Sequence, residues 1–227
     1  GRPDTITAEK LRVLRAHGVG RVSVNPQTMS DSVLEAIGRR HTAQDIVDAL
    51  ALVRECGGFE VNMDLIAGLP TDTAGGFSRT LDAVLSLAPE NVTVHTLSLK
   101  RGSGLTLAGR PLPEAGEVRA MLDEAMERLA GSGYAPYYLY RQKNTLQNLE
   151  NVGWCKPGKA CLYNIYMMEE LHSIVALGAG ATSKANLPGG RLERFANPKI
   201  PQQYLERLDH VIAEKQRLVQ LLRQGKE

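Results

Sequence analysis

The sequence has few cysteines, few aromatic residues and almost no net charge. Its 227 residues include three cysteines, and 5% of them are aromatic. Three cysteines are too few for a disulfide framework, so we expect reduced thiols and a cytoplasmic protein. Cys155 and Cys161 have neither a second cysteine pair nor a spaced histidine pair beside them, which argues against a zinc site. The remaining thiol is Cys56.

Several classes of protein are excluded by further absences. The formal net charge is +2, so the overall balance does not indicate nucleic acid or a membrane surface as a partner. No apolar run reaches the roughly 18 residues that a membrane span needs. The glycine-rich stretch around Gly178 and Gly180 lacks a third glycine at the dinucleotide spacing. A small-molecule ligand therefore remains the expected partner.

The first half of the chain repeats one unit, in which an amphipathic helix is followed by glycine and a short strand. The unit occurs at residues 8–24, 43–70 and 77–99. In the second unit, Thr42 is the expected N-cap and Gly57 the expected stop of the helix. Helices that alternate with β-branched strands predict parallel pairing, as in an α/β layer or barrel.

Each predicted strand carries a row of polar side chains, although parallel strands covered on both faces are almost entirely apolar. The rows are Ser23, Asn25 and Gln27; Asn62 and Asp64; Thr93 and His95. One interpretation is the solvated face of an antiparallel sheet. The other is the interior of an incompletely packed barrel that encloses a ligand at the C-terminal ends of its strands. The helical crossovers favour the second.

The pattern changes after about residue 110. We expect a helix over residues 114–134 and a strand over 137–141. A loop-rich stretch over 144–166 and an apolar strand over 173–178 follow, and the chain closes with an amphipathic helix over 202–222. The expected division is a barrel part over residues 1–111 and a small α+β cap over residues 112–227.

The residues that we expect to carry chemistry are Gln27, Arg39 and Asp64. A carboxylate at a strand end can accept hydrogen bonds from both hydroxyls of a ribose. An arginine can hold a carboxylate through two parallel hydrogen bonds, and a carboxamide can donate and accept at once. Together they suit an adenosyl ligand with an amino-acid tail.

Seven segments of the sequence, taken in order, resemble segments of a known protein family. They are GRPDTIT, RVSVNPQTM, IGRRHT, NMDLIAGLP, YYLYRQKN, NLENVGWCKPGKACLYNIYMMEE and ALGAGATSK. In this order the chain resembles the oxygen-independent coproporphyrinogen III oxidase (dehydrogenase) family of radical SAM proteins, and within it the HemZ-type branch. The resemblance implies the C-terminal half of a radical SAM (β/α)6-type partial barrel, followed by the α+β cap.

The resemblance also implies the chemistry. In that family, residues matching Gln27, Arg39 and Asp64 contact S-adenosylmethionine (SAM), and the region of the substrate or a second SAM matches Tyr163, Asn164 and Thr182. The implied cofactors are SAM and a [4Fe–4S] cluster. The implied partners are a porphyrinogen or other tetrapyrrole and an electron donor. The implied reaction is oxidative decarboxylation of propionate to vinyl groups in porphyrin and haem biosynthesis.

One departure from the family limits what the chain can do alone. The family holds its cluster with a C-x-x-x-C-x-x-C loop, which this sequence lacks, and the first residue is Gly1. We therefore expect a C-terminal piece of a longer enzyme, without metal ligands of its own and inactive in isolation. Two alternatives use the same scaffold: a haem chaperone-like tetrapyrrole-binding protein, or a radical SAM methyltransferase or haem-opening enzyme.

Overall fold

The chain folds into two compact units, Gly1–Ala160 and Cys161–Glu227. The structure is a computed structural model, and it describes residues 2–98, 111–141 and 150–224. The sequence placed the change of organisation at residues 111/112. In the structure, the segment from residue 112 to 160 belongs to the first unit, because its strands extend the first unit's sheet.

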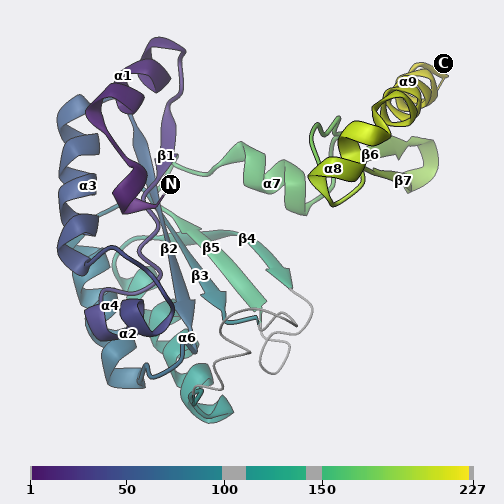
Figure 1. Cartoon of the computed structure of the whole chain (residues 1–227). Helices are drawn as coiled ribbons and strands as arrows, with labels where there is room; N and C mark the ends of the chain where they lie inside the picture. The colour runs from purple at the N-terminus through teal and green to yellow at the C-terminus, as the bar shows by residue number, and fades with distance from the viewer. Residues whose placement is uncertain (1, 99–110, 142–149, 225–227) are drawn as a thin grey trace. The chain divides into compact units, whose positions relative to one another are not determined.

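A five-stranded sheet forms the centre of the first unit, in the order β1-β2-β3-β5-β4 (Figure 1). Its three N-terminal strands are parallel, as predicted, whereas β5 is antiparallel to both β3 and β4. Within the described residues the sheet is open, with β1 and β4 at its edges. The strands are β1 (Arg21–Ser23), β2 (Glu60–Ala67), β3 (Asn91–Thr96), β4 (Ala135–Arg141) and β5 (Glu150–Cys155).

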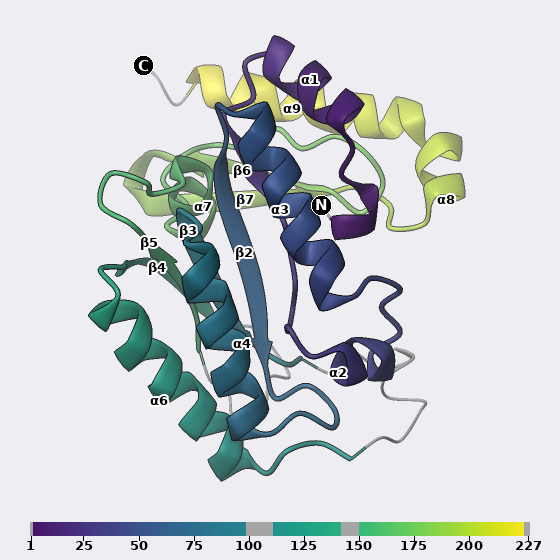
Figure 2. The same cartoon turned by 90° about the vertical axis from the view of Figure 1, so that its left-hand side faces the viewer.

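Helices connect the parallel strands and cover one face of the sheet. Figure 2 shows α3, α4 and α6 lying across the face of the sheet that is turned to the viewer. This arrangement confirms the predicted helical crossovers between parallel strands. The helical segments among the described residues of the first unit are η1 (Pro3–Thr5), α1 (Ala8–Ala16), α2 (Asp31–Ala36), α3 (Ala43–Cys56), α4 (Ala74–Leu87) and α6 (Ala115–Gly131).

Local sequence signals explain where these helices begin and end. Thr42 caps α3 through a capping box with Asp45, as the sequence indicated. Gly57 follows α3 at φ +65°, a conformation that glycine adopts without steric cost. After α4 the chain turns at Ala88, whose φ is +50°, and Pro89 prevents the helix from continuing.

The two faces of β2 differ sharply in burial. Val61, Met63 and Leu65 are fully buried against the helices, while Asn62 and Asp64 alternate with them and lie on the other face. This period of two places the apolar side chains in one core and aligns the polar ones on a single surface. The predicted polar rows therefore belong to the face of a parallel sheet opposite its helices, and not to an antiparallel sheet.

The second unit is a small α+β assembly. An antiparallel hairpin of β6 (Thr182–Leu187) and β7 (Arg191–Ala196) packs on the last helix, and Ala185, Phe195 and Leu218 form its core. Its helical segments are α7 (Leu162–Met168), η3 (Pro188–Gly190), α8 (Pro201–Glu206) and α9 (Leu208–Gln224). The C-terminal helix predicted over 202–222 is thus divided at Arg207.

Two sequence-based assignments were wrong. The apolar stretch 173–178 is not a strand: it makes only an isolated bridge from Ile174 to Lys184, and Leu177 is 79% exposed. Hydrophobicity alone suggested a buried strand there. Conversely, β5 lies inside the stretch predicted to be loop-rich. Its Asn151 and Gly153 have low strand propensity, and pairing on both sides with β3 and β4 overrides it.

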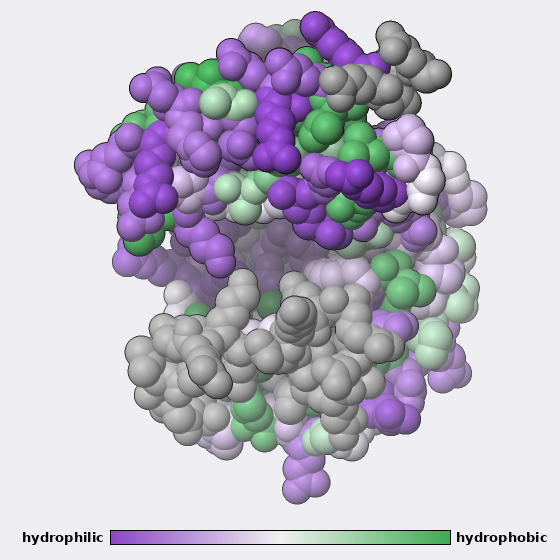
Figure 3. Space-filling view, turned by 90° about the vertical axis from the view of Figure 1, so that its right-hand side faces the viewer, coloured by the Kyte–Doolittle hydropathy of each residue, from purple (hydrophilic) through white to green (hydrophobic). Residues whose placement is uncertain are grey.

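The described residues on the face shown in Figure 3 are mainly hydrophilic. In Figure 3 hydrophobic side chains form small separate patches between hydrophilic ones. Among the described residues, no helix is both long and apolar enough to pass through a bilayer.

Candidate functional site

Polar side chains of β2, β3 and β4 meet on the face of the sheet opposite α3, α4 and α6. Asn62 donates from Nδ2 to Oδ1 of Asp64 at 2.8 Å, and its Oδ1 accepts from the hydroxyl of Thr93 at 3.3 Å. His95 lies two residues after Thr93 on β3, and its Nε2 is 3.7 Å from Oδ1 of Asp64. The side chain of Asp64 is 24% exposed, so the carboxylate remains open to a ligand.

The environment of Asp64 favours the ionised form. Burial raises the pKa of this carboxyl, but the interaction with His95 and the hydrogen bond from Asn62 lower the pKa by a larger amount, so that it lies below its ordinary value. At neutral pH the site thus presents a partly buried carboxylate that accepts hydrogen bonds.

Two tyrosines of β4 contact the polar side chains of β3 on this face. The hydroxyl of Tyr140 lies 2.8 Å from Nδ1 of His95, and that of Tyr138 lies 3.2 Å from the hydroxyl of Thr93. The two rings are stacked, with their centroids 6.2 Å apart. The tyrosine ring at position 138 lies over Gly153 of β5, at which any Cβ would overlap it.

Gln27 follows β1 and joins the same edge of the sheet. Its backbone N–H donates to the carbonyl of Asp64 at 2.9 Å, and its own carbonyl accepts from Ile66 at 2.9 Å. Its φ is +70°, in the left-handed region that non-glycine residues seldom adopt. These backbone hydrogen bonds hold Gln27, which follows β1, against β2, where it bridges to Leu65 and contacts the carbonyl of Asp64.

Arg39 is positioned by α2. Val33 of this helix packs with Leu69 and Leu97, which follow β2 and β3, so the helix is held at the C-terminal edge of the sheet. The chain then turns at Gly38, whose φ is +71°, and reaches Arg39. Within the described part of the chain, the guanidinium of Arg39 makes no hydrogen bond or ion pair, which leaves it available to an anion.

The other three predicted site residues lie in the second unit. Tyr163 and Asn164 stand in the first turn of α7, and the Tyr163 side chain is 68% exposed. Thr182 begins β6, where it pairs with Ala196 of β7. Their role in binding a substrate or a second SAM stays a prediction.

The sequence reasoning missed Tyr138 and Tyr140. It interpreted YYLYR as a strand without asking which side chains share a face. The signal was present, because residues two apart on a strand point to the same side. The partner of Tyr140 could not be inferred, because β4 joins the sheet through β5, which the sequence did not reveal.

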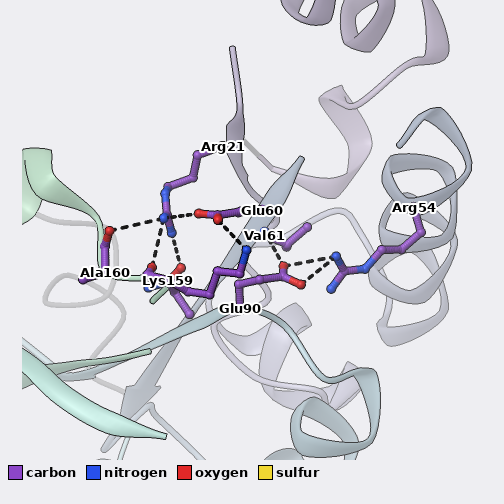
Figure 4. Close-up of polar contacts among 8 residues, drawn as sticks. Arg21, Arg54, Glu60, Val61, Glu90, Lys159 and Ala160 are labelled. Carbon is purple, nitrogen blue, oxygen red and sulfur yellow. Dashed lines mark hydrogen bonds and ion pairs between the residues drawn. The ribbon is translucent and has the colours of Figure 1, made fainter. Parts of the chain in front are cut away.

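The opposite, N-terminal edge of the sheet holds a separate ionic network (Figure 4). Arg21 contacts Glu60 and Asn91 and donates to the carbonyl of Lys159 at 2.9 Å, and the Lys159 ammonium donates to Glu60 at 2.9 Å. These contacts tie the first residues of β1, β2 and β3 to the chain that follows β5. We assign this network to stability, since it satisfies its charges internally.

The three cysteines are free thiols. Cys56 ends α3, Cys155 is buried at the end of β5 and Cys161 precedes α7. Burial raises the pKa of the Cys155 thiol, although Arg21 lowers it in part. Across the described ranges, no three histidine, cysteine, aspartate or glutamate side chains gather as a metal site would require.

Comparison with known proteins relates the chain to one superfamily. Residues 2–84 match the Radical SAM superfamily. The oxygen-independent coproporphyrinogen-III oxidase-like protein HemZ of Bacillus subtilis is 46% identical over 218 residues, which are 95% of this chain and 44% of that protein. The haem chaperone HemW of Haemophilus influenzae is 26% identical over 89% of this chain and 50% of its own length.

The fold of this chain is similar to that of a solved structure. The coproporphyrinogen III oxidase HemN of Escherichia coli, described as a radical SAM enzyme, superposes with a TM-score of 0.69 at 22% identity, covering 92% of this chain and 48% of HemN. The chain thus spans about half the length of the relatives that it matches. On the sequence and fold together, the chain is HemZ-like and belongs to the radical SAM superfamily.

Proposed function

We propose that this chain is the SAM-binding part of a radical SAM oxidoreductase that resembles oxygen-independent coproporphyrinogen III dehydrogenase. The observation that carries the proposal is the backbone hydrogen bond from Gln27 to the carbonyl of Asp64, which holds both residues at the C-terminal edge of parallel strands. The proposed architecture is a partial (β/α)6-type barrel, of which β1, β2 and β3 are parallel strands.

The residues at this edge fit SAM by their chemistry. The Asp64 carboxylate is ionised and open, as an acceptor for the two ribose hydroxyls must be. The guanidinium of Arg39 suits the methionyl carboxylate. Two residues before Gln27, Oδ1 of Asn25 is buried and has no hydrogen-bond partner among the described residues, so a polar ligand would satisfy it.

The residues described in this chain do not form a binding site for the [4Fe–4S] cluster. Bound SAM supplies the hydrogen-abstracting species when a reduced [4Fe–4S] cluster cleaves it, but the described residues offer no group of metal ligands. We therefore propose that the cluster ligands lie outside this chain, which alone neither binds a cluster nor cleaves SAM. Iron analysis after anaerobic reconstitution tests this, and about four irons per chain would contradict it.

The proposed substrate is a porphyrinogen or another tetrapyrrole whose propionates lose carbon dioxide, with a separate electron donor as partner. Support comes from the HemZ relative, which is named for coproporphyrinogen oxidation. In the second unit, we propose Tyr163, Asn164 and Thr182 as contacts to that substrate or to a second SAM.

The binding of SAM to the chain tests the main proposal. We expect equilibrium dialysis with labelled SAM to detect binding, and Asp64→Asn or Arg39→Lys to weaken it at least tenfold, because each loses a charge-assisted hydrogen bond worth about 1.5–3 kcal/mol. The matched control is Arg40→Lys, since Arg40 is the exposed neighbour of Arg39. Equal loss in the control, or no binding by the unaltered chain, would reject the assignment.

A second function, haem binding, is favoured by the HemW relatives. The HemW proteins of Haemophilus influenzae and Bacillus subtilis are 26% and 32% identical to this chain and are named haem chaperones. A haem titration distinguishes the two proposals. A Soret shift that saturates at one haem per chain supports the chaperone, while no shift leaves the oxidoreductase.

A further inference from the structure

Two neighbouring side chains contact the Asp64 carboxylate at the same oxygen, Oδ1. Asn62 Nδ2 donates to Oδ1 at 2.8 Å, and Nε2 of His95 faces the same oxygen from β3 at 3.7 Å. The side chains of Asp64 and His95 are 24% and 23% exposed, so the pair lies at the boundary of the core. The orientation of the carboxylate therefore depends on which His95 nitrogen carries hydrogen.

Tyr140 fixes that nitrogen. Its hydroxyl lies 2.8 Å from Nδ1 of His95, on the side of the ring away from Asp64. Burial, aided by Tyr138 and Asp64, raises the pKa of Tyr140 to about 12, so the phenol keeps its proton. Because a bare Nε2 lone pair would repel the Asp64 carboxylate, the neutral imidazole carries its hydrogen on Nε2, and the Tyr140 hydroxyl donates to Nδ1. A neutral imidazole whose Nδ1 accepts must carry its hydrogen on Nε2. That hydrogen faces the carboxylate.

We infer that Tyr140 and His95 are positioning residues, which act in series to hold the Asp64 carboxylate for the vicinal hydroxyls of a nucleoside. The inference rests on the proposed function, in which Asp64 binds the ribose of SAM. Three neighbouring groups from β4, β3 and β2 form the series, so its geometry is set by the sheet and not by a loop.

Removing the Tyr140 hydroxyl would remove the hydrogen-bond donor to Nδ1 of His95. Without a donor at Nδ1, the tautomer with hydrogen on Nδ1 becomes accessible, and its Nε2 lone pair then faces the Asp64 oxygen. That arrangement repels the carboxylate and turns it away from a ribose. Tyr140→Phe removes one oxygen atom and should produce this change with little effect on packing.

Nitrogen NMR of 15N-histidine-labelled chain reads the tautomer directly, and His95→Gln assigns the signal among the five histidines. We expect His95 of the unaltered chain to carry hydrogen on Nε2 and Tyr140→Phe to shift it toward Nδ1. The affinity for SAM itself should fall about three- to tenfold in parallel, as expected for one hydrogen bond. The matched control is Tyr134→Phe, which removes a buried hydroxyl that donates to the carbonyl of Pro89 at 2.6 Å, remote from Asp64.

Two results would overturn the positioning role. One is a His95 tautomer that Tyr140→Phe leaves unchanged. The other is an affinity that Tyr140→Phe leaves unchanged although Asp64→Asn weakens binding at least tenfold, in which case SAM binding itself stands. If the unaltered chain binds no SAM while the tautomer shifts as expected, the SAM assignment fails and the nucleoside ligand with it. A purely structural role predicts lower stability without a tautomer change, and so also counts against the inference.

Discussion

At the residue scale, Gln27 combines an unfavourable backbone conformation with a predicted binding role. A left-handed conformation costs a non-glycine residue about 1–2 kcal/mol. Two backbone hydrogen bonds to β2 hold it there. Such outliers gather at binding sites, where the rest of the fold imposes a geometry that the residue alone would avoid. The strain is thus a second, independent reason to place Gln27 in the site.

Gly153 is the residue whose replacement should disturb the polar face most directly. A Cβ at this position would overlap Cε1 and Cδ1 of Tyr138, so Gly153→Ala must displace the ring and its contact with Thr93. We expect the free energy of unfolding to fall by about 1–3 kcal/mol, as for other overpacked sites. Urea denaturation followed by tryptophan fluorescence measures the change.

Gly116 of α6 provides the control for that substitution. Its added Cβ has no atom within 4 Å, and alanine is the better helix former, so Gly116→Ala should be neutral or slightly stabilising. A Gly153→Ala protein as stable as the control would mean that Tyr138 can leave its place at no cost.

At the element scale, Glu90 joins α3 to the starts of β2 and β3. Its carboxylate accepts from the Val61 N–H at 2.7 Å and from Nη1 of Arg54 at 3.0 and 3.1 Å. Burial raises the pKa of Glu90, but these hydrogen bonds lower the pKa by a larger amount. The pKa of Glu90 therefore lies below its ordinary value of 4.5. The ionised form is therefore the one that stabilises this corner.

The stability that Glu90 provides should depend on pH. Because its pKa is lower in the folded than in the unfolded chain, the contribution is complete above the unfolded value and disappears as the pH falls through the folded value. We expect Glu90→Gln to reduce the free energy of unfolding at pH 7 by about 1–3 kcal/mol. The difference from the unaltered chain should shrink as urea titrations are repeated at pH values below about 4.5.

Glu55, on the exposed surface of α3, is the reference for that experiment. Glu55→Gln changes the net charge equally, without the contacts to Val61 and Arg54. A Glu90→Gln deficit that stays constant with pH would show that shape, and not charge, holds the corner.

Sequence periodicity predicted the elements that depend on neighbours close in the chain. The capping box of α3 and the alternation in β2 are local, and both are confirmed. The place of β5 between β3 and β4 depends on pairing between segments distant in sequence, which no local pattern encodes. For the same reason Asp64 and His95 were identified as polar strand residues, while their link to Tyr140 was not.

At the scale of the whole molecule, the two compact units have separate cores. The first unit is centred on the sheet and its covering helices, and the second on Ala185, Phe195 and Leu218. Chains with separate cores commonly unfold in more than one step. The single tryptophan, Trp154, is buried in β5 and thus reports on the first unit alone.

Lys215 offers a way to destabilise the second unit selectively. Its ammonium donates to the hydroxyl of Ser183 at 2.7 Å and to Oδ1 of Asn197 at 2.9 Å, which ties α9 to the hairpin. Both partners are buried. Lys215→Met keeps the apolar stem but leaves these two polar groups short of a donor. We expect a loss of about 1–3 kcal/mol in the stability of the second unit.

Two probes in one urea titration check this prediction. Circular dichroism follows the helices of both units, whereas fluorescence follows Trp154, so Lys215→Met should move part of the first signal and leave the second in place. Lys199→Met, at an exposed lysine, should move neither. If fluorescence and circular dichroism instead shift together by the same amount, the units unfold as one. The stability of the sheet that carries Asp64 would then depend on contacts within the second unit.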